Sequence, residues 1–352
     1  SKPVTGDDVM RLASERAALP WETQTTLHIP RREVDATKRD KLLVALRASD
    51  RVKASVKEKS DDELLDHYQL AQGQALTNLG VLCLGRQHHR AQLTTAPVIQ
   101  FIKYDEHGQK VNKLVWDDHT QSPMELIEAV WLEVPDFRER YELPDGLYRQ
   151  NVPAFDEIVV RELLVNALVH RPYTQRGDIF LNLHPDRLEM VNPGLLPLGV
   201  TPQNVLHTTV CRNEYMARLF HDLKLMERES SGFDKIFEVL LSQGRPAPEL
   251  VETHDRVQVT VRRRILKPEV IDFIAKADQT YQLTQRERIV LGLLAQHDAL
   301  TARELAGTLE LPSVKALQPW LKRLLDWNLV QSIGRTQATR YFVDPGLLRS
   351  LN

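Results

Sequence analysis

The chain is organised around one stretch, Arg161-Glu162-Leu163-Leu164-Val165-Asn166-Ala167-Leu168-Val169-His170-Arg171. Residues 158–169 are rich in apolar side chains and lack Pro and Gly, which predicts a helix packed on most sides. Glu162, Asn166 and His170 are each four residues apart, so on a helix they stack along one face. Such groups are costly to bury without partners. They either pair with one another and the backbone, or face water or a cleft. Three in register, with glycine turns later in the chain, favour the cleft.

Composition excludes several classes of protein. The 352 residues include 46 basic and 48 acidic side chains, a net charge of −2, so any nucleic-acid contact must come from a local patch. The two cysteines have no CxxC partner, which argues against a disulfide framework or a structural zinc and favours a reducing compartment. No apolar run reaches membrane-spanning length and no signal peptide is visible, so we expect a cytoplasmic protein. The beginning, Ser1-Lys2-Pro3-Val4, suggests a fragment of a longer chain.

Periodicity and capping signals predict a mixture of helices and hairpins. Residues 77–85 are small and apolar, and are read as a buried helix or the start of a strand. Asn192-Pro193-Gly194 is expected to break the second strand of a hairpin that turns at Pro185-Asp186. The other predicted helices are 5–18, 38–46, 61–68, 122–134, 213–225 and 233–241, and the predicted strands are 98–104, 111–116, 178–184, 187–191 and 257–261.

The last seventy residues have a pattern of their own. Helices are expected over 283–296, 301–309 and 313–327, the last capped by Ser313 and bent or shortened by Pro319. A two-stranded ribbon, 329–333 and 339–343, should follow around the turn at 334–337. This order is typical of a winged helix-turn-helix.

These motifs carry a resemblance. Glu162-x-x-x-Asn166-Ala167-x-x-His170 resembles the N box of the gyrase, histidine-kinase and MutL (GHKL) type of ATP-binding fold. Together with Arg187 to Gly194, Arg212-Asn213, Ser231-Gly232, the 77–82 segment and the final winged helix, it resembles a family of bacterial transcriptional regulators related to the C-terminal part of RecG. The resemblance runs from about residue 60 onward. It implies that Ser1 to about Arg16 is the tail of a Schlafen/AlbA-like domain. No helicase activity is expected, because there is no GxxxxGK[ST] loop.

The resemblance implies an ATP and Mg²⁺ site. Asn166 would ligate the Mg²⁺, Glu162 would orient or deprotonate the attacking water, and His170 would hold the polar network. At the first turn, Asn192 would accept a hydrogen bond from the adenine amino group, and Gly194 would let the backbone approach the base. At the second turn, Ser231-Gly232 would bind phosphate at the start of the helix at Phe233.

The sequence departs from the family pattern at the later glycine turn. One glycine is missing from Glu229-Ser230-Ser231-Gly232, and Glu227 and Glu229 bring negative charge to the phosphate position. The earlier turn departs as well, because Leu195 follows Gly194 where a second glycine is common. An alternative is therefore a vestigial nucleotide fold that serves rigidity or dimerisation.

The predicted winged helix offers basic side chains for DNA phosphates. They are Lys315, Lys322 and Arg323 on the third helix, and Arg335 and Arg340 on or beside the ribbon tip. The alternatives are a solvated face or a protein contact.

Taken together, the sequence predicts an α+β protein. A mixed N-terminal segment (1–148, the tail of the Schlafen/AlbA-like domain plus a connecting region) precedes a GHKL-like α/β sandwich (149–267) and a winged helix-turn-helix (280–352). The expected function is that of a DNA-binding transcriptional regulator whose central domain binds ATP and Mg²⁺ as a signal. The alternatives are a slow ATPase acting with nucleic acid, for example in defence against foreign DNA, and a homo-oligomeric scaffold without nucleotide.

Overall fold

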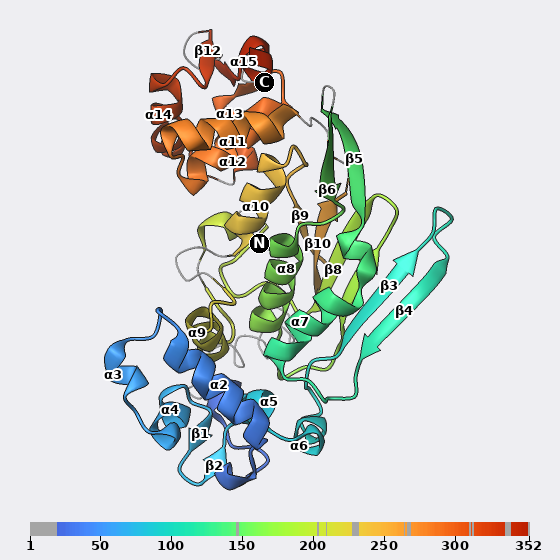
Figure 1. Cartoon of the computed structure of the whole chain (residues 1–352), viewed down its shortest axis with the longest axis vertical. Coiled ribbons are helices and arrows are strands. Elements are labelled where there is room, and N and C mark those ends of the chain that lie inside the picture. The colour runs from blue at the N-terminus through green and yellow to red at the C-terminus, as the bar shows by residue number, and fades with distance from the viewer. Residues whose placement is uncertain are drawn as a thin grey trace, which may run out of the picture.

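The computed structural model describes residues 20–145, 148–202, 204–208, 210–226, 232–263, 265, 269–309, 311, 313–334 and 339–350. The helix expected over 5–18 and the candidate residues Ser231 and Arg335 lie outside these ranges. The described chain forms an N-terminal helical lobe, a central sheet with its helices, and a C-terminal helical unit, which follow one another along the long axis (Figure 1). It is an α+β chain, as its sequence predicts, and its central sheet is mixed.

Capping and burial explain the helices of the N-terminal lobe. The helix α4 (Asp61–His67) begins where predicted, because Ser60 and Glu63 form a capping box. Residues 77–85, left open between a helix and a strand, contain the helix α5 (Asn78–Leu84), which Thr77 caps and which is buried throughout. The rest of the lobe is made of η1 (Trp21–Thr23), η2 (Arg31–Glu33), α2 (Ala36–Ala48), α3 (Ala54–Lys57), β1 (Ala71–Gln72), β2 (Ala75–Leu76) and α6 (Gln87–Gln92).

The central sheet draws strands from both sides of residue 149. Its order is β4-β3-β7-β8-β10-β9, and β3 and β7 are its parallel pair. Burial alternates along β7, so one face of the sheet turns to the core. The strands are β3 (Ile99–Tyr104), β4 (Lys110–Trp116), β7 (Ile179–Leu183), β8 (Arg187–Pro193), β9 (Glu249–Glu252) and β10 (Arg256–Arg262).

The strand β8 corrects one prediction. It continues through Asn192 and Pro193, which pair with Val257 and Arg256 of β10, and the break comes only at Gly194. Pro193 is tolerated because it is the last residue of the strand, where a missing N–H costs little of the ladder.

The helices that pack on the central sheet determine where the candidate site lies. The helix α8 (Glu157–His170) contacts α7 (Pro123–Glu133), α10 (Phe233–Ser242) and β8. The helix α9 (Glu214–Asp222) lies toward the N-terminal lobe (Figure 1), where the buried carboxylate of Glu22 accepts hydrogen bonds from the first N–H groups of α9. The remaining elements of this part are η3 (Pro135–Arg138), β5 (Arg140–Asp145), β6 (Tyr148–Pro153) and η4 (Val205–His207).

The C-terminal unit contains one helix that the sequence did not predict and a different third helix. The helix α11 (Glu269–Tyr281) precedes α12 (Gln285–Gln296) and α13 (Ala302–Thr308). Ser313 makes no side-chain cap. Instead η5 (Val314–Leu317) leads into α14 (Gln318–Asp326), and Pro319 lies in the first turn of α14, where its missing N–H costs nothing. The expected two-stranded ribbon is a three-stranded sheet, in which β13 (Arg340–Phe342) lies between β11 (Leu300–Thr301) and β12 (Gln331–Ile333), before α15 (Pro345–Ser350).

None of the helices in the described part of the chain is both long enough and apolar enough to cross a membrane.

Candidate functional site

The helix α8 is held rigidly at both ends. Asp156 caps its start by accepting a hydrogen bond from the Ile158 N–H. At its end, the buried Asn213 amide donates to the carbonyl oxygens of Val169 and Arg171 at 2.7 and 2.8 Å, and the Arg212 guanidinium donates to the carbonyl of His170. The Arg212-Asn213 pair therefore orients the helix that carries the predicted polar stripe.

A cavity opens along part of this stripe. Asn166 and His170 of α8 line it together with Asn192 of β8, whereas Glu162 is not among the lining residues. The cavity volume is about 90 Å³, well below the roughly 300–1,000 Å³ of pockets that enclose drug-sized ligands. The space is therefore about that of one small chemical group.

Asn192 has a fixed orientation. Its amide nitrogen donates to the carbonyl oxygen of Ala167 at 3.1 Å, so turning the amide over would bring two oxygens together. The Asn192 Oδ1 is buried and has no hydrogen-bond partner among the described residues. Asn192, a residue that lines the cavity, thus has a buried and uncharged acceptor without a partner among the described residues.

His170 and Asn166 add two more polar atoms. The His170 Nδ1 and the Asn166 Nδ2 are buried without a hydrogen-bond partner in the described chain. Burial, reinforced by the nearby Arg212 guanidinium, lowers the pKa of His170 to about 4. The imidazole is therefore neutral at pH 7. Buried polar atoms without partners are rare in folded proteins, and three from residues of one cavity make it the candidate site of this chain.

Gly232 brings the start of α10 against α8. A Cβ at Gly232 would lie 2.0 Å from Glu162 Oε1 and 3.0 Å from Asn166 Nδ2, and the residue has φ +74°. Only glycine permits both the angle and the approach. The Glu162 side chain, 8% exposed, therefore fills the space beside the N-terminus of α10. A helix N-terminus favours a negative group, so this is a stable place for a carboxylate.

The other sequence-predicted residues of the nucleotide site are separated. Gly194 (φ +86°) packs on Pro172, whose Cγ would lie 2.5 Å from a Cβ at that position, and Gly194 does not line the cavity. The structure thus brings Asn166, His170 and Asn192 to one cavity, sets Glu162 and Gly232 beside it, and leaves Gly194 apart.

Sequence reasoning missed the apolar walls. They come from the connection after β8, from α10, and from the two closing strands. A signal was present in the apolar run Leu195-Leu196-Pro197, which follows Gly194 without forming a regular element. Apart from the three polar residues already named, the lining residues are Leu163, Ala167, Met190, Leu195, Leu196, Pro197, Val200, Val205, Thr208, Val210, Phe233, Ile236, Leu250, Val257 and Val259.

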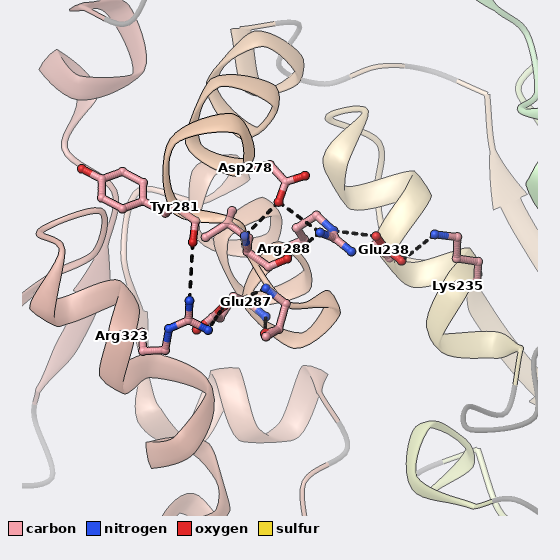
Figure 2. Close-up of polar contacts among 9 residues, drawn as sticks. Lys235, Glu238, Asp278, Tyr281, Glu287, Arg288 and Arg323 are labelled. Atoms are coloured by element: carbon pink, nitrogen blue, oxygen red, sulfur yellow. Dashed lines mark hydrogen bonds and ion pairs between the residues drawn. The ribbon is translucent and has the colours of Figure 1, made fainter.

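The described DNA-binding candidates divide into two groups. Lys315, Lys322 and Arg340 are exposed. Arg323 is also exposed, but it is held by contacts within the fold: it pairs with the buried Glu287 at 3.2 Å, and its guanidinium lies over the Trp327 ring (Figure 2 shows the pairing). Arg323 therefore has a structural role that its sequence position did not indicate.

The chain was compared with known proteins by sequence family and by fold. Residues 177–261 match the family described as "Putative ATP-dependent DNA helicase recG C-terminal". The matched range runs from β7 to β10 and excludes α8. No curated protein matches the chain. In fold, the chain is similar to the crystal structure of the DIP2311 protein from Corynebacterium diphtheriae, with 20% identity and a TM-score of 0.73, over 99% of this chain and 69% of that one. The central part is thus similar to a RecG-related, ATPase-like domain.

This match implies an adenine nucleotide with Mg²⁺. The base, the phosphates and the metal are compared with the residues of the site in turn. The apolar walls and the Asn192 acceptor match the chemistry of the base, in a space of about 90 Å³. The phosphates and metal do not fit this arrangement, since the Glu162 carboxylate already lies beside the N-terminus of α10.

Proposed function

We propose that this chain is a DNA-binding regulator whose ATPase-like domain senses a ligand with an adenine-type base. The observation that carries the proposal is the convergence of Asn166, His170 and Asn192 on one cavity, each with a buried polar atom that has no partner among the described residues. A ligand that supplies those hydrogen bonds stabilises the folded state, because each unmade bond costs about 1–3 kcal/mol.

DNA binding is assigned to the C-terminal unit. Its elements follow the order helix, short strand, helix, helix, ribbon, in the manner of a winged helix. Lys315 lies just before the third helix, Lys322 lies on it and Arg340 lies on the ribbon, and all three are exposed. Such side chains reach phosphates and make binding depend strongly on salt.

The helix α10 connects the two functions. Phe233 and Ile236 of α10 line the cavity. On the same helix the buried Glu238 pairs with Lys235 at 2.9 Å and with Arg288 of α12 at 2.6 Å (Figure 2). Arg288 also donates to Asp278 of α11 at 3.1 Å. A shift of α10 on ligand binding would therefore reach α11 and α12, and α12 packs against α14, which carries Lys322.

The DNA-binding half is tested with a charge-removed variant. Retention on duplex DNA is measured against salt for the wild type and for Lys315→Ala/Lys322→Ala/Arg340→Ala. The control is Lys53→Ala/Lys110→Ala/Lys113→Ala, which removes three exposed charges elsewhere. We expect weaker retention and a salt slope reduced by about 1 per lost phosphate contact in the first variant alone. Equal retention by both variants would refute DNA binding by this unit.

The ligand-sensing half is tested by thermal unfolding with adenosine or with ATP and Mg²⁺, for the wild type and Asn166→Ala. A ligand at 100 times its Kd stabilises the folded state by about 2.7 kcal/mol. We expect a rise in the midpoint for the wild type and a smaller one for the variant. No rise with either ligand would refute the sensing role.

A further inference from the structure

We infer that the cavity selects an uncharged nucleobase and that phosphates add nothing to its binding. This rests on the proposed function and names the part of the ligand that the site recognises. It departs from what the ATPase-like match implies, since an ATPase site draws much of its affinity from phosphates and Mg²⁺.

The chemistry of the cavity wall is the first ground. Apart from Asn166, His170, Asn192 and Thr208, every described lining residue is apolar, and the four polar ones are uncharged at pH 7. A charged group placed against such a wall loses its hydration without gaining a counter-charge. The space of about 90 Å³ is also too small for a base together with a triphosphate.

The hydrogen-bonding pattern is the second ground. Asn192 Oδ1 is a fixed acceptor, because its own amide nitrogen is tied to Ala167. Asn166 Nδ2 is a donor, and the neutral His170 Nδ1 donates or accepts according to its tautomer. A ligand that carries an amino group beside a ring nitrogen complements both asparagines. Adenine has this edge, and asparagine is the side chain that pairs with it in nucleic-acid recognition.

The N-terminus of α10 is the third ground. A phosphate bound there would share the positive end of the helix with the Glu162 carboxylate, which lies against Gly232. Two anions at one helix end repel each other, and displacing Glu162 would disturb a side chain that is only 8% exposed. Binding of the base alone leaves this contact intact.

The experiment varies the ligand against the wild-type protein, so that no result depends on the folding of a variant. Calorimetry measures the Kd of adenosine, of purine riboside, which lacks the amino group, and of ATP with Mg²⁺. We expect adenosine to bind at least as tightly as ATP with Mg²⁺. Purine riboside should bind about 10- to 100-fold more weakly than adenosine, because Asn192 Oδ1 is then left unpaired.

Each other outcome counts against the inference in a separate way. If ATP with Mg²⁺ binds tenfold or more tightly than adenosine, the inference is overturned and the sensing role stands. If purine riboside equals adenosine, recognition by Asn192 is wrong. If none of the ligands binds, both the inference and the ligand-sensing role fail. Glu162→Gln serves as a further check: it should raise the affinity for ATP relative to adenosine, since it removes the competing charge.

Discussion

Gly232→Ala tests the contact between α10 and α8 on which the candidate site depends. At φ +74° an alanine costs about 1–2 kcal/mol more than at an ordinary angle. Its Cβ would also lie 2.0 Å from Glu162 Oε1, a distance that forces the buried carboxylate to move. Overpacking of this kind costs about 1–3 kcal/mol. We therefore expect a loss of about 2–5 kcal/mol, a large share of the stability of a typical domain.

The matched control is Gly108→Ala. Gly108 has the same φ of +74°, in the turn between β3 and β4, and a Cβ there would meet nothing within 4 Å. Hydrogen exchange of the α10 amides reports the free energy of opening of that helix. Urea unfolding reports the change in the free energy of unfolding for both variants. Both variants therefore place a Cβ at φ +74°, but only Gly232→Ala also meets the Glu162 carboxylate.

A double-mutant cycle completes this test. In the Gly232→Ala background, Glu162→Ala removes the overlapping carboxylate and should restore about 1–3 kcal/mol. If Gly232→Ala and Gly108→Ala lose equal stability, or if Glu162→Ala restores nothing, the close approach does not exist and the site argued from it falls.

Three further predictions concern titration and the C-terminal unit. The pKa of His170 is about 4 in the fold against 6.5 unfolded, so the unfolded state binds more protons in that window, and the contribution of His170 to stability falls by about 2 kcal/mol as pH falls from 7.5 to 5. Because Glu22 acts in the opposite direction over the same window, we expect little net pH dependence of wild-type urea unfolding, whereas His170→Gln should be about 2 kcal/mol less stable at pH 7.5 than at pH 5. The buried carboxyl of Glu22 behaves in the opposite sense, because burial raises its pKa from 4.5 to about 7: the folded state binds more protons in that window, and the contribution of Glu22 to stability falls by about 2 kcal/mol as pH rises from 5 to 7.5. Glu22→Gln should therefore be about 2 kcal/mol less stable at pH 5 than at pH 7.5, and a pH dependence equal to that of the wild type would contradict the burial of Glu22. Finally, Arg323→Ala should destabilise the C-terminal unit by about 1–2 kcal/mol, because buried Glu287 loses its partner. The neighbouring Lys322→Ala should change the free energy of unfolding by no more than about 0.5 kcal/mol. Equal urea midpoints for the two variants would contradict this.

Local signals in the sequence predicted individual elements well. Ser60 and Ser122 are each followed three residues later by Glu, and each begins a helix with a capping box. The alternation on either side of Pro185-Asp186 predicted the β7–β8 hairpin. These predictions were confirmed because capping and alternation depend on residues a few positions apart.

Other elements could not be predicted in this way. The helix α11 has no capping signal that the sequence analysis recognised, and it packs on α12 and α10. The third helix was predicted wrongly at its start, because Pro319 was read as an interruption although proline suits the first turn of a helix.

The candidate site was likewise predictable only in part. The four-residue spacing predicted that Glu162, Asn166 and His170 share a face of one helix, and Asn166 and His170 do line one cavity. The assignment of roles among them remains a prediction. The spacing could not say which of the three would face the cavity, because neighbouring elements decide that.

By itself, the sequence determined the helix that carries the polar stripe, the hairpin that follows it and the α+β class, since each depends on periodicity and capping within a short segment. Only the tertiary structure decided three contacts. Asn192 is fixed beside the polar face of α8 by its hydrogen bond to Ala167, Gly232 lets the start of α10 lie against Glu162, and Arg323 pairs with Glu287. Those contacts join residues from about 25 to 70 positions apart, and such pairings are set by how the helices pack on the sheet and on one another.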